Sequence, residues 1–384
     1  MRIAYYLELG DSIEDMLGVI KKIDEKLNIW QHHGHIVHLF LVGRIHTLSL
    51  ANVFSFDKVS IYSVGKQKFK GYHHLNILFG RVFPEQRQAI FDLAQFQPDV
   101  FYFRSIFPSP IINYALKNHN CFFECNTYID GELDNIASKN ILGVLYKLFY
   151  LRNRNNIYCR TKGVLSLTYE IANSIKKYNP NVNLEVVPNG ISLKREDIVL
   201  SANTISYSDP IKMVFIGSPG ANWHGLDHIL EFARINGGKV NVDIIGFDGE
   251  GLPSLNNVRY HGILPRNKYE KIIEQADIGL GTFALYRKQM DEACPLKVRE
   301  YLKFGLPVVL GYSDTAFINK EIPFVYQVPN TADGLISHAN EVIDFCNIRR
   351  GKKLSIEEVR PLIDTHFFEE QRLKFIERTL SIYK

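Results

Sequence analysis

The sequence lacks the features that would assign it to several specialised classes of protein. Its 384 residues include five cysteines and no C-x-x-C pair, which argues against a disulfide scaffold or a zinc module and favours a reducing compartment. No run of about 18 or more apolar residues is present, so we expect no membrane-spanning helix. The first residues have the pattern of a strand that includes Glu8, not that of a signal peptide. We therefore expect a soluble, cytoplasmic protein.

The sequence also has little net charge and no complete nucleotide-loop motif. Forty-five Lys and Arg against 41 Asp and Glu give a net charge of +4, which is too small to indicate a nucleic-acid partner. The P-loop motif G-x-x-x-x-G-K-[ST] is absent, which excludes a P-loop NTPase. The segment Gly217-Ser-Pro-Gly220 follows a strand pattern but lacks the three-glycine fingerprint of a dinucleotide loop.

Short apolar runs alternate with helical patterns along the first half of the chain. We expect strands at 2–9, 36–42, 59–63, 100–103, 121–124 and 164–167, with helices at 12–26, 84–96, 111–118 and 169–178. After residue 190 the alternation of strand and helix patterns begins again. Strands are expected at 212–216, 240–246, 258–261, 278–282, 307–310 and 324–327, and helices at 225–235, 266–276, 295–304 and 332–346. The last part, 355–383, is helical and is expected to break at Pro361.

Strands separated by helices of this length predict parallel β-α-β units. The fold class is therefore α/β, with two Rossmann-like, doubly wound parallel-sheet domains facing a cleft. We place the first domain at 1–188 and the second at 189–364, and we expect the helix at 365–384 to cross back to the first domain.

The most informative segment begins at Glu292 and contains a second carboxylate at Glu300. Pro295 suits the first helical position, and Gly305 suits the stop. Glu292 then lies in the loop before the helix, and Glu300 lies in its second turn. Between them the free backbone N–H groups near Leu296, Lys297 and Val298 form an anion site.

Two carboxylates on either side of an anion site fit a ligand with hydroxyl groups on both sides of a phosphate. A nucleotide-sugar has that order of ribose, diphosphate and hexose. The alternative is structural: Glu300 pairs with Lys297 or Arg299 on a solvated helix, and Glu292 is an ordinary loop residue.

The segment resembles the E-x7-E motif of retaining, GT-B-fold glycosyltransferases of family 4. Three other segments match the family in order: Gly34-His-Ile-Val-His38, Val187-Pro-Asn-Gly-Ile191, and the strand, glycine loop and helix start from Val214 to Asp227. The absence of D-x-D counts against the metal-dependent GT-A type. The resemblance implies a first domain that binds the acceptor and a second that binds the donor.

The resemblance also implies roles for individual residues. Glu300 would bind the ribose hydroxyls, Glu292 the donor hexose, and the backbone around Leu296 and Lys297 the diphosphate. The remaining residues that we assign to the donor site are Pro295, Gly217, Ser218, His224, Gly262, Ile263 and Arg287. On the acceptor side we assign Gly10 and Asp11. Near the reacting centre we assign Asn126, where many relatives have a histidine, and Glu124.

The chain departs from the family pattern at the phosphate clamp. Ser218 and His224 stand where an Arg and a Lys are usual, and an imidazole is a weaker phosphate partner than a lysine. Arg287, Lys288 or Lys297 is expected to compensate.

A separate signal lies between residues 135 and 169, which include no acidic residue but several basic ones among apolar and aromatic side chains. Such a helix suits a peripheral contact with the inner face of the cell membrane through 139–162. A core helix with a solvated basic end is the alternative.

Taken together, these patterns predict a metal-independent, retaining glycosyltransferase without a cofactor. It would move a hexose from a UDP- or GDP-linked donor to a glycan or lipid-linked acceptor. The family resemblance implies that it does so in bacterial surface polysaccharide synthesis. Three alternatives stay open: a nucleotide-sugar epimerase of GT-B shape, a non-catalytic carbohydrate-binding subunit, and an NAD-dependent oxidoreductase.

Overall fold

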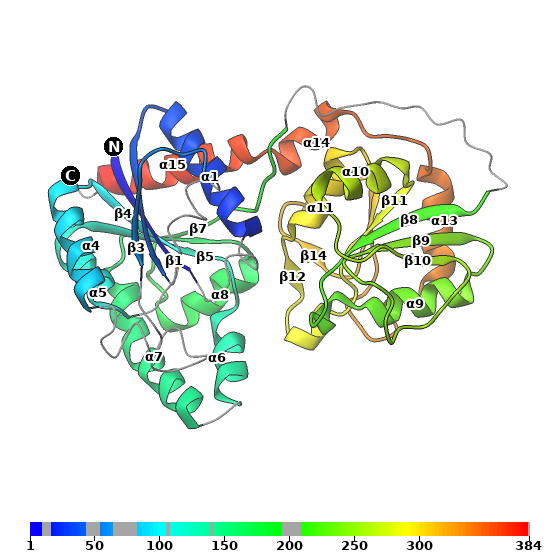
Figure 1. Ribbon diagram of the computed structural model, residues 1–384, viewed down its shortest axis with the longest axis horizontal. Helices are drawn as coiled ribbons and strands as arrows, with labels where there is room; N and C mark the ends of the chain where they lie inside the picture. The colour runs from blue at the N-terminus through cyan, green and yellow to red at the C-terminus, as the bar shows by residue number, and fades with distance from the viewer. Residues whose placement is uncertain are drawn as a thin grey trace. The chain divides into compact units, whose positions relative to one another are not determined.

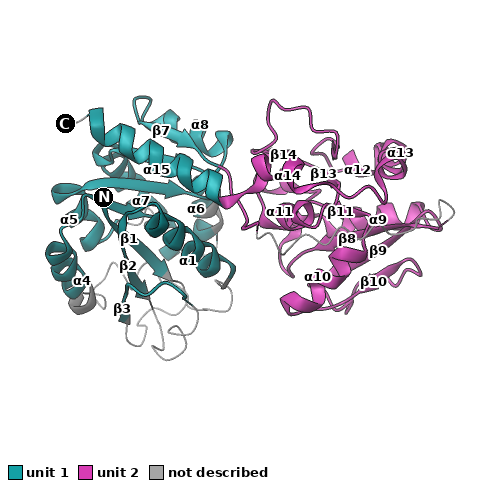
Figure 2. Ribbon diagram, turned by 90° about the horizontal axis from the view of Figure 1, so that it is seen from above, with its two compact units in different colours: residues 1–187, 366–384 teal, residues 188–365 magenta. Residues whose placement is uncertain are grey.

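The computed structural model describes residues 1–9, 17–43, 54–63, 83–104, 108–138, 141–193 and 209–382. The chain forms two compact units (Figure 2): unit 1 comprises residues 1–187 and 366–384, and unit 2 comprises residues 188–365. Each unit is built around one parallel sheet (Figure 1).

Unit 1 contains a seven-stranded sheet with the order β3-β2-β1-β4-β5-β6-β7. Its strands are β1 (Arg2–Leu9), β2 (Ile36–Gly43), β3 (Val59–Ser63), β4 (Val100–Phe103), β5 (Asn120–Cys125), β6 (Gly163–Ser166) and β7 (Leu184–Val186). Its helices are α1 (Leu17–His32), α4 (Phe83–Phe96), α5 (Pro110–Asn118), α6 (Ile129–Ala137), α7 (Ile141–Arg160), α8 (Tyr169–Tyr178) and α15 (Thr365–Ile382). One face of the sheet packs on α4, α5, α7 and α8, and the other face packs on α1 and α15.

Unit 2 contains a six-stranded parallel sheet with the order β10-β9-β8-β11-β13-β15. Its strands are β8 (Ile211–Ile216), β9 (Val240–Ile245), β10 (Val258–Tyr260), β11 (Ile278–Leu280), β13 (Val308–Leu310) and β15 (Val325–Gln327); β12 (Glu292–Ala293) and β14 (Ser313–Asp314) form a separate pair. Its helices are η3 (Asn222–His224), α9 (Leu226–Ile235), α10 (Arg266–Gln275), η4 (Leu285–Lys288), α11 (Leu296–Lys303), α12 (Gly334–Ser337), α13 (Ala339–Arg349) and α14 (Ile356–Ile363). The prediction of two doubly wound parallel sheets is therefore confirmed.

Two predicted helices were wrong in their extent. The first helix continues to His32 because Ile20, Ile23, Leu27 and Trp30 extend its buried stripe at helical spacing. The helix expected at 332–346 is two helices that meet at His338.

The C-terminal helical segment does not break at Pro361, which lies inside α14. It breaks at Asp364, because the chain there is extended and pairs with Ile191: the Ile191 N–H donates to the carbonyl of Ile363, and the Thr365 N–H donates to that of Ile191. The first and last segments of unit 2 are thereby held together.

Candidate functional site

The E-x7-E segment lies at the carboxyl edge of the unit 2 sheet. Glu292 is in β12, and α11 begins at Leu296. Pro295 has an extended backbone and is the N-cap residue, so the helix begins one residue later than expected. Val298, Tyr301 and Leu302 are fully buried, as their helical spacing predicts.

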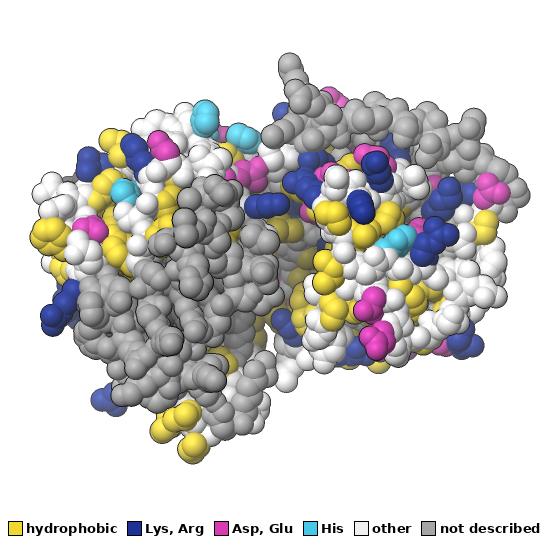
Figure 3. All heavy atoms as spheres, viewed as in Figure 1, with side chains coloured by type: hydrophobic (Ala, Val, Ile, Leu, Met, Phe, Trp, Pro, Cys, Tyr) yellow, Lys and Arg dark blue, Asp and Glu magenta, His cyan; other side chains and the backbone are white. Residues whose placement is uncertain are grey.

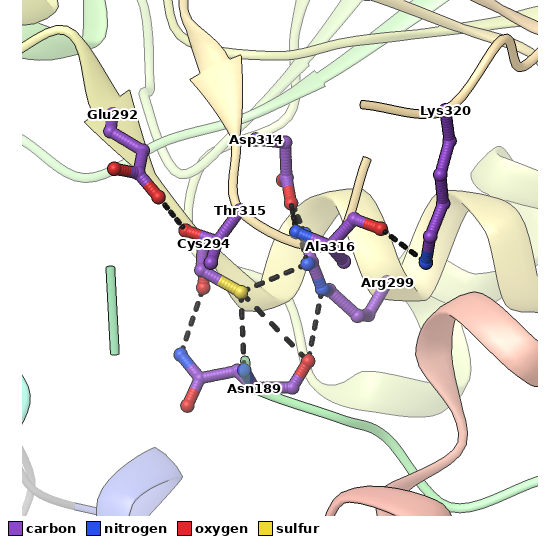
Figure 4. Close-up of polar contacts among 8 residues, drawn as sticks. All are labelled: Asn189, Glu292, Cys294, Arg299, Asp314, Thr315, Ala316 and Lys320. Carbon is purple, nitrogen blue, oxygen red and sulfur yellow. Dashed lines mark hydrogen bonds and ion pairs between the residues drawn. The ribbon is translucent and has the colours of Figure 1, made fainter. Parts of the chain in front are cut away.

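Arg299 is fully buried and forms a two-pronged ion pair with Asp314, which is also buried. Figure 4 shows how this pair joins the surrounding loops: Arg299 Nη2 lies 2.9 Å from Cys294 Sγ, and Nε donates to the carbonyl of Asn189 at 3.1 Å. The Asn189 side chain in turn donates to the carbonyl of Cys294 at 2.8 Å. These contacts fix the loop that carries Glu292 against the turn at which unit 2 begins.

Each carboxylate of the motif has a hydroxyl partner on another element. Thr315 Oγ1 donates to Glu292 Oε1 at 2.8 Å (Figure 4), and Tyr269 Oη, on α10, donates to Glu300 Oε1 at 3.2 Å. Burial raises the pKa of Glu300, and the bond from Tyr269 partly offsets this shift. The alternative in which Glu300 pairs with Lys297 or Arg299 is therefore wrong, because both cations point elsewhere.

Lys297 is buried beside the carboxyl end of β8. Its ammonium donates to the carbonyl of Ile216 at 3.1 Å and lies 4.3 Å from the ring centre of Phe215. Among the described residues, no carboxylate lies within ion-pair distance of it. Burial lowers its pKa to about 7. A buried ammonium without a counter-ion is costly, so this position suits a ligand that brings negative charge.

His224 lies in η3, next to the loop after β8. Its Nδ1 accepts a hydrogen bond from the Ser218 N–H at 3.2 Å. Burial, together with the charges of Lys297 and Lys288, lowers its pKa to about 3. The imidazole is therefore neutral, and with Nδ1 occupied as an acceptor its Nε2 carries the proton.

Two glycines shape the same edge, Gly246 through a close backbone contact and Gly262 through a positive φ. A Cβ on Gly246 would lie 2.0 Å from the carbonyl oxygen of Gly217, so the two backbones touch. Gly262 has a φ of 64° and donates to the carbonyl of Phe247 at 2.7 Å. Ile263, which follows it, is almost fully exposed. The course of the backbone at this end of the edge therefore depends on glycine at both positions.

Arg287 is not directed into the site. It forms an exposed bidentate ion pair with Asp227 and also donates to the carbonyl of Asn222 at 2.8 Å. Lys288 lies 4.5 Å from the ring centre of Trp223. Of the three cations expected to compensate for the missing clamp, Lys297 has the closest contact with the end of β8.

Unit 1 holds Asn126 directly after β5. Its amide donates to Glu124 Oε1 at 2.9 Å, and Tyr102 donates to Glu124 Oε2 at 2.6 Å. Lys26, on α1, completes a buried ion pair with the same carboxylate. Burial alone would raise the pKa of Glu124, but Lys26 and the neighbouring cations hold it well below its usual value.

Among the described residues, the side-chain amide oxygen (Oδ1) of Asn126 has no hydrogen-bond partner. The NH2 group of the same amide faces Glu124, because a carboxylate can only accept. Gly10 and Asp11 lie outside the described residues. In the described part of the chain, no group of three or more His, Cys, Asp or Glu side chains could hold a metal ion.

Sequence reasoning missed Lys26, Tyr102, Tyr269, Asp314 and Thr315. Lys26, Tyr102, Tyr269 and Thr315 each contact a predicted residue that is 22 to 98 positions away in the chain. Asp314 contacts Arg299, which is 15 positions away and was not assigned to the site. No local pattern marks them, because the segment that carries each of them is distant in sequence from the residue that it contacts.

Comparison with known proteins shows a likeness in structure alone. No protein-family profile matches the chain, and no curated protein matches its sequence. Sucrose-phosphate synthase from Thermosynechococcus elongatus is similar with a TM-score of 0.65 and 11% identity, over 100% of both chains. Anabaena HepE, solved in complex with UDP-glucose, has a TM-score of 0.62 and 12% identity over 98% of this chain and 100% of that one. An alpha-glucosyltransferase, solved with UDP and a 13-mer DNA, has a TM-score of 0.59 and 12% identity over 98% of this chain and 99% of that one.

These neighbours are glycosyltransferases, and their fold is GT-B. This chain has the GT-B fold. At identities of this size the likeness shows the fold alone, so function has to be argued from the site.

Proposed function

We propose that the chain is a glycosyltransferase that transfers a hexose from a nucleoside diphosphate sugar. The observation that carries the proposal is Lys297, a buried ammonium with no carboxylate partner in the described part of the chain. It stands in the first turn of α11, where free backbone N–H groups also favour an anion. Glu292 and Glu300 flank this point at the two ends of the E-x7-E motif.

The donor would bind in the order that these groups dictate. Glu300 would accept hydrogen bonds from the ribose hydroxyls, and Glu292, oriented by Thr315, would accept from the hexose. The diphosphate would contact Lys297, the first N–H groups of α11 and the Nε2–H of His224. Because these groups supply positive charge and donors, the proposed reaction requires neither a metal ion nor a cofactor.

Transfer would break the bond between the anomeric carbon and the diphosphate oxygen and form a bond to an acceptor hydroxyl oxygen. The hydroxyl proton would pass to the departing diphosphate, so the step balances without a further reactant. The site would act by positioning and by stabilising the leaving charge. Retention of the anomeric configuration is the outcome that the resemblance to family 4 favours.

In unit 1 we assign the acceptor side, with a glycan or lipid-linked acceptor. The side-chain amide oxygen of Asn126, which has no partner in the described part of the chain, would accept a hydrogen bond from a sugar hydroxyl at the end of β5. Glu124 is enclosed by Lys26, Tyr102 and Asn126, so we assign it a positioning role that acts through Asn126.

The test is a calorimetric titration with UDP, GDP, ADP and NAD on the wild type, Glu300→Ala and Glu274→Ala. A hydrogen bond to a charged group contributes roughly 1.5–3 kcal/mol, so Glu300→Ala should weaken the nucleotide that binds by about 10- to 100-fold. Glu274, on the exposed side of α10, is the matched control and should leave binding unchanged.

Binding of NAD alone, or equal binding by Glu300→Ala and the wild type, would overturn the donor-site assignment. Absence of any nucleotide binding would favour the non-catalytic carbohydrate-binding subunit. Product analysis with the nucleotide-sugar that binds separates the other candidates: a glycoside and free nucleotide indicate transfer, and an isomerised nucleotide-sugar indicates an epimerase. A DNA acceptor would contradict the assigned acceptor class.

A further inference from the structure

Helix α7 has an apolar face that nothing in the described part of the chain covers. Its inner face, formed by Gly143, Tyr146, Tyr150, Arg154 and Ile157, packs into the core of unit 1. Its first two turns also carry Ile141, Leu142, Val144, Leu145 and Leu148, which point outward. Ile141 is 71% exposed, Leu145 55% and Leu148 57%.

These side chains form a stripe, since residues 141, 144, 145 and 148 follow the i, i+3, i+4, i+7 spacing of one helix face. We call residues 141, 142, 144, 145 and 148 the α7 tip. A surface helix of a globular protein normally exposes polar residues on its outer face. Clustered exposed apolar side chains, by contrast, mark an interaction surface. The hydrophobic side chains at the bottom of unit 1 in Figure 3 lie where α6 and α7 meet in Figure 1.

The α7 tip also projects beyond the sheet. α7 has 20 residues and is therefore about 30 Å long, whereas β5 has six residues and spans about 20 Å. The chain leaves the carboxyl end of β5, passes through α6 and returns along α7 to the start of β6. The start of α7 therefore lies at the carboxyl edge of the sheet, which is the edge that holds Asn126.

Charge changes along the same face. The outward stripe continues to Arg152, one turn beyond Leu148, and the exposed end of the helix carries Arg160. Lys147 pairs with Asp134 and Arg154 pairs with Asp130, but neither Arg152 nor Arg160 has a carboxylate partner among the described residues. The sequence has no acidic residue between 135 and 169. An apolar tip followed by unpaired arginines matches the depth profile of a bilayer surface, with hydrocarbon first and anionic headgroups next.

We propose that the α7 tip inserts into the surface of a bilayer that contains anionic lipid. A second copy of the chain would bury the apolar residues equally well, but it would give no role to the unpaired arginines behind them. In the described part of the chain, no helix is long and apolar enough to cross a membrane, so the contact is a peripheral one. The membrane contact itself does not depend on the proposed function, but its role does: the contact would bring a lipid-linked acceptor to the carboxyl edge of unit 1.

The test is co-sedimentation of the full chain with vesicles of phosphatidylcholine alone and of phosphatidylcholine mixed with phosphatidylglycerol. The wild type should bind the mixed vesicles more tightly. The double variant Leu145→Ser, Leu148→Ser should lose about 10- to 100-fold in affinity, because two apolar side chains no longer enter the hydrocarbon. Arg152→Gln should reduce the preference for phosphatidylglycerol and leave weak binding to phosphatidylcholine unchanged.

Ile348→Ser is the matched control. Ile348 is 60% exposed on α13 in unit 2, so its replacement removes an equally exposed apolar side chain away from the tip and should leave vesicle binding unchanged. All of the changed residues are exposed, so the variants should fold, and their thermal unfolding should match that of the wild type.

Three results would overturn the proposal: no binding of the wild type to either vesicle, equal binding by the double variant, or a dimer that dissociates on Leu145→Ser, Leu148→Ser. Nucleotide titration of the same proteins keeps the two proposals separate. The double variant should bind nucleotide as the wild type does. Failure of the wild type to bind any nucleotide would overturn the proposed function and leave the vesicle result standing.

Discussion

Removing the buried ammonium of Lys297 should make donor binding both weaker and independent of pH. Burial lowers its pKa to about 7, so in the free protein the side chain is charged below that pH and neutral above it. A bound diphosphate brings two negative charges to the ammonium and should raise its pKa back toward the ordinary value. Donor binding and proton uptake are then linked.

The size of the linkage follows from the pKa. A lysine with a pKa of about 7 is charged in about nine-tenths of the molecules at about pH 6 and in about one-tenth at about pH 8. Because the donor binds the charged form, affinity should fall about tenfold between these pH values, which is about 1.4 kcal/mol. Binding should take up about 0.1 proton at the lower pH and about 0.9 at the higher.

The assay is calorimetry in buffers of different ionisation enthalpy, from which the proton uptake is obtained. The ligand should be a nucleotide-sugar rather than a free nucleoside diphosphate, since a terminal phosphate itself titrates near pH ~6. In the free protein His224 is neutral throughout this range, because its pKa is about 3. The Lys297→Met variant therefore decides whether Lys297 is the group that takes up the proton.

Lys297→Met should weaken binding by about 10- to 100-fold at the lower pH and should abolish both the pH slope and the proton uptake. Lys353→Met is the matched control: burial also lowers the pKa of Lys353, to about 8, but its ammonium donates to the carbonyls of Glu274 and Ala276, away from the motif. A wild-type affinity that is flat with pH, or a slope that survives in Lys297→Met, would refute the reasoning.

Two further changes probe the geometry around the donor. Thr315→Val removes the hydroxyl that orients Glu292 and should weaken a nucleotide-sugar several-fold while leaving the free nucleotide unchanged, which competition titrations would show; an equal loss for both ligands would contradict the assignment of Glu292 to the hexose. Gly246→Ala would place a Cβ 2.0 Å from the Gly217 carbonyl, so urea unfolding should show a loss of about 2 kcal/mol or more. Gly238→Ala is the control, because Gly238 has a similar positive φ but open space where a Cβ would lie. An equally large loss of stability in Gly238→Ala would mean that backbone strain, not the close contact with Gly217, explains the effect.

The fold followed from the sequence because its signals are local. Buried strands such as 2–9 and 100–103 are short apolar runs, and helices such as 266–276 carry their own periodicity. Their alternation fixes a parallel sheet through the geometry of the crossover. The extent of a helix does not follow from local signals alone, because its end depends on what packs on it. α1 continues to His32 because Trp30 contacts Tyr102 and Tyr5 on the sheet.

For the donor site, the sequence determined the E-x7-E spacing and the helix that separates the two glutamates, since both depend on residues within one turn or two. It did not determine which cation faces the donor. Lys297 and Arg299 are two residues apart and chemically alike. Arg299 is neutralised by Asp314, whereas Lys297 reaches the end of β8 and has no counter-ion among the described residues. Only the packing of α11 against β8 and β14 separates them.

The same distinction applies in unit 1 and at α7. Lys26 and Glu124 are 98 residues apart, and no pattern along the chain pairs them, because the sheet brings α1 and β5 together. At α7 the sequence showed apolar residues on every side of the helix, so it could not tell the core face from the free one. Composition and periodicity act through neighbours in the chain and therefore fix the elements. Burial, counter-ions and exposure act through neighbours in space, and only the tertiary structure decided them.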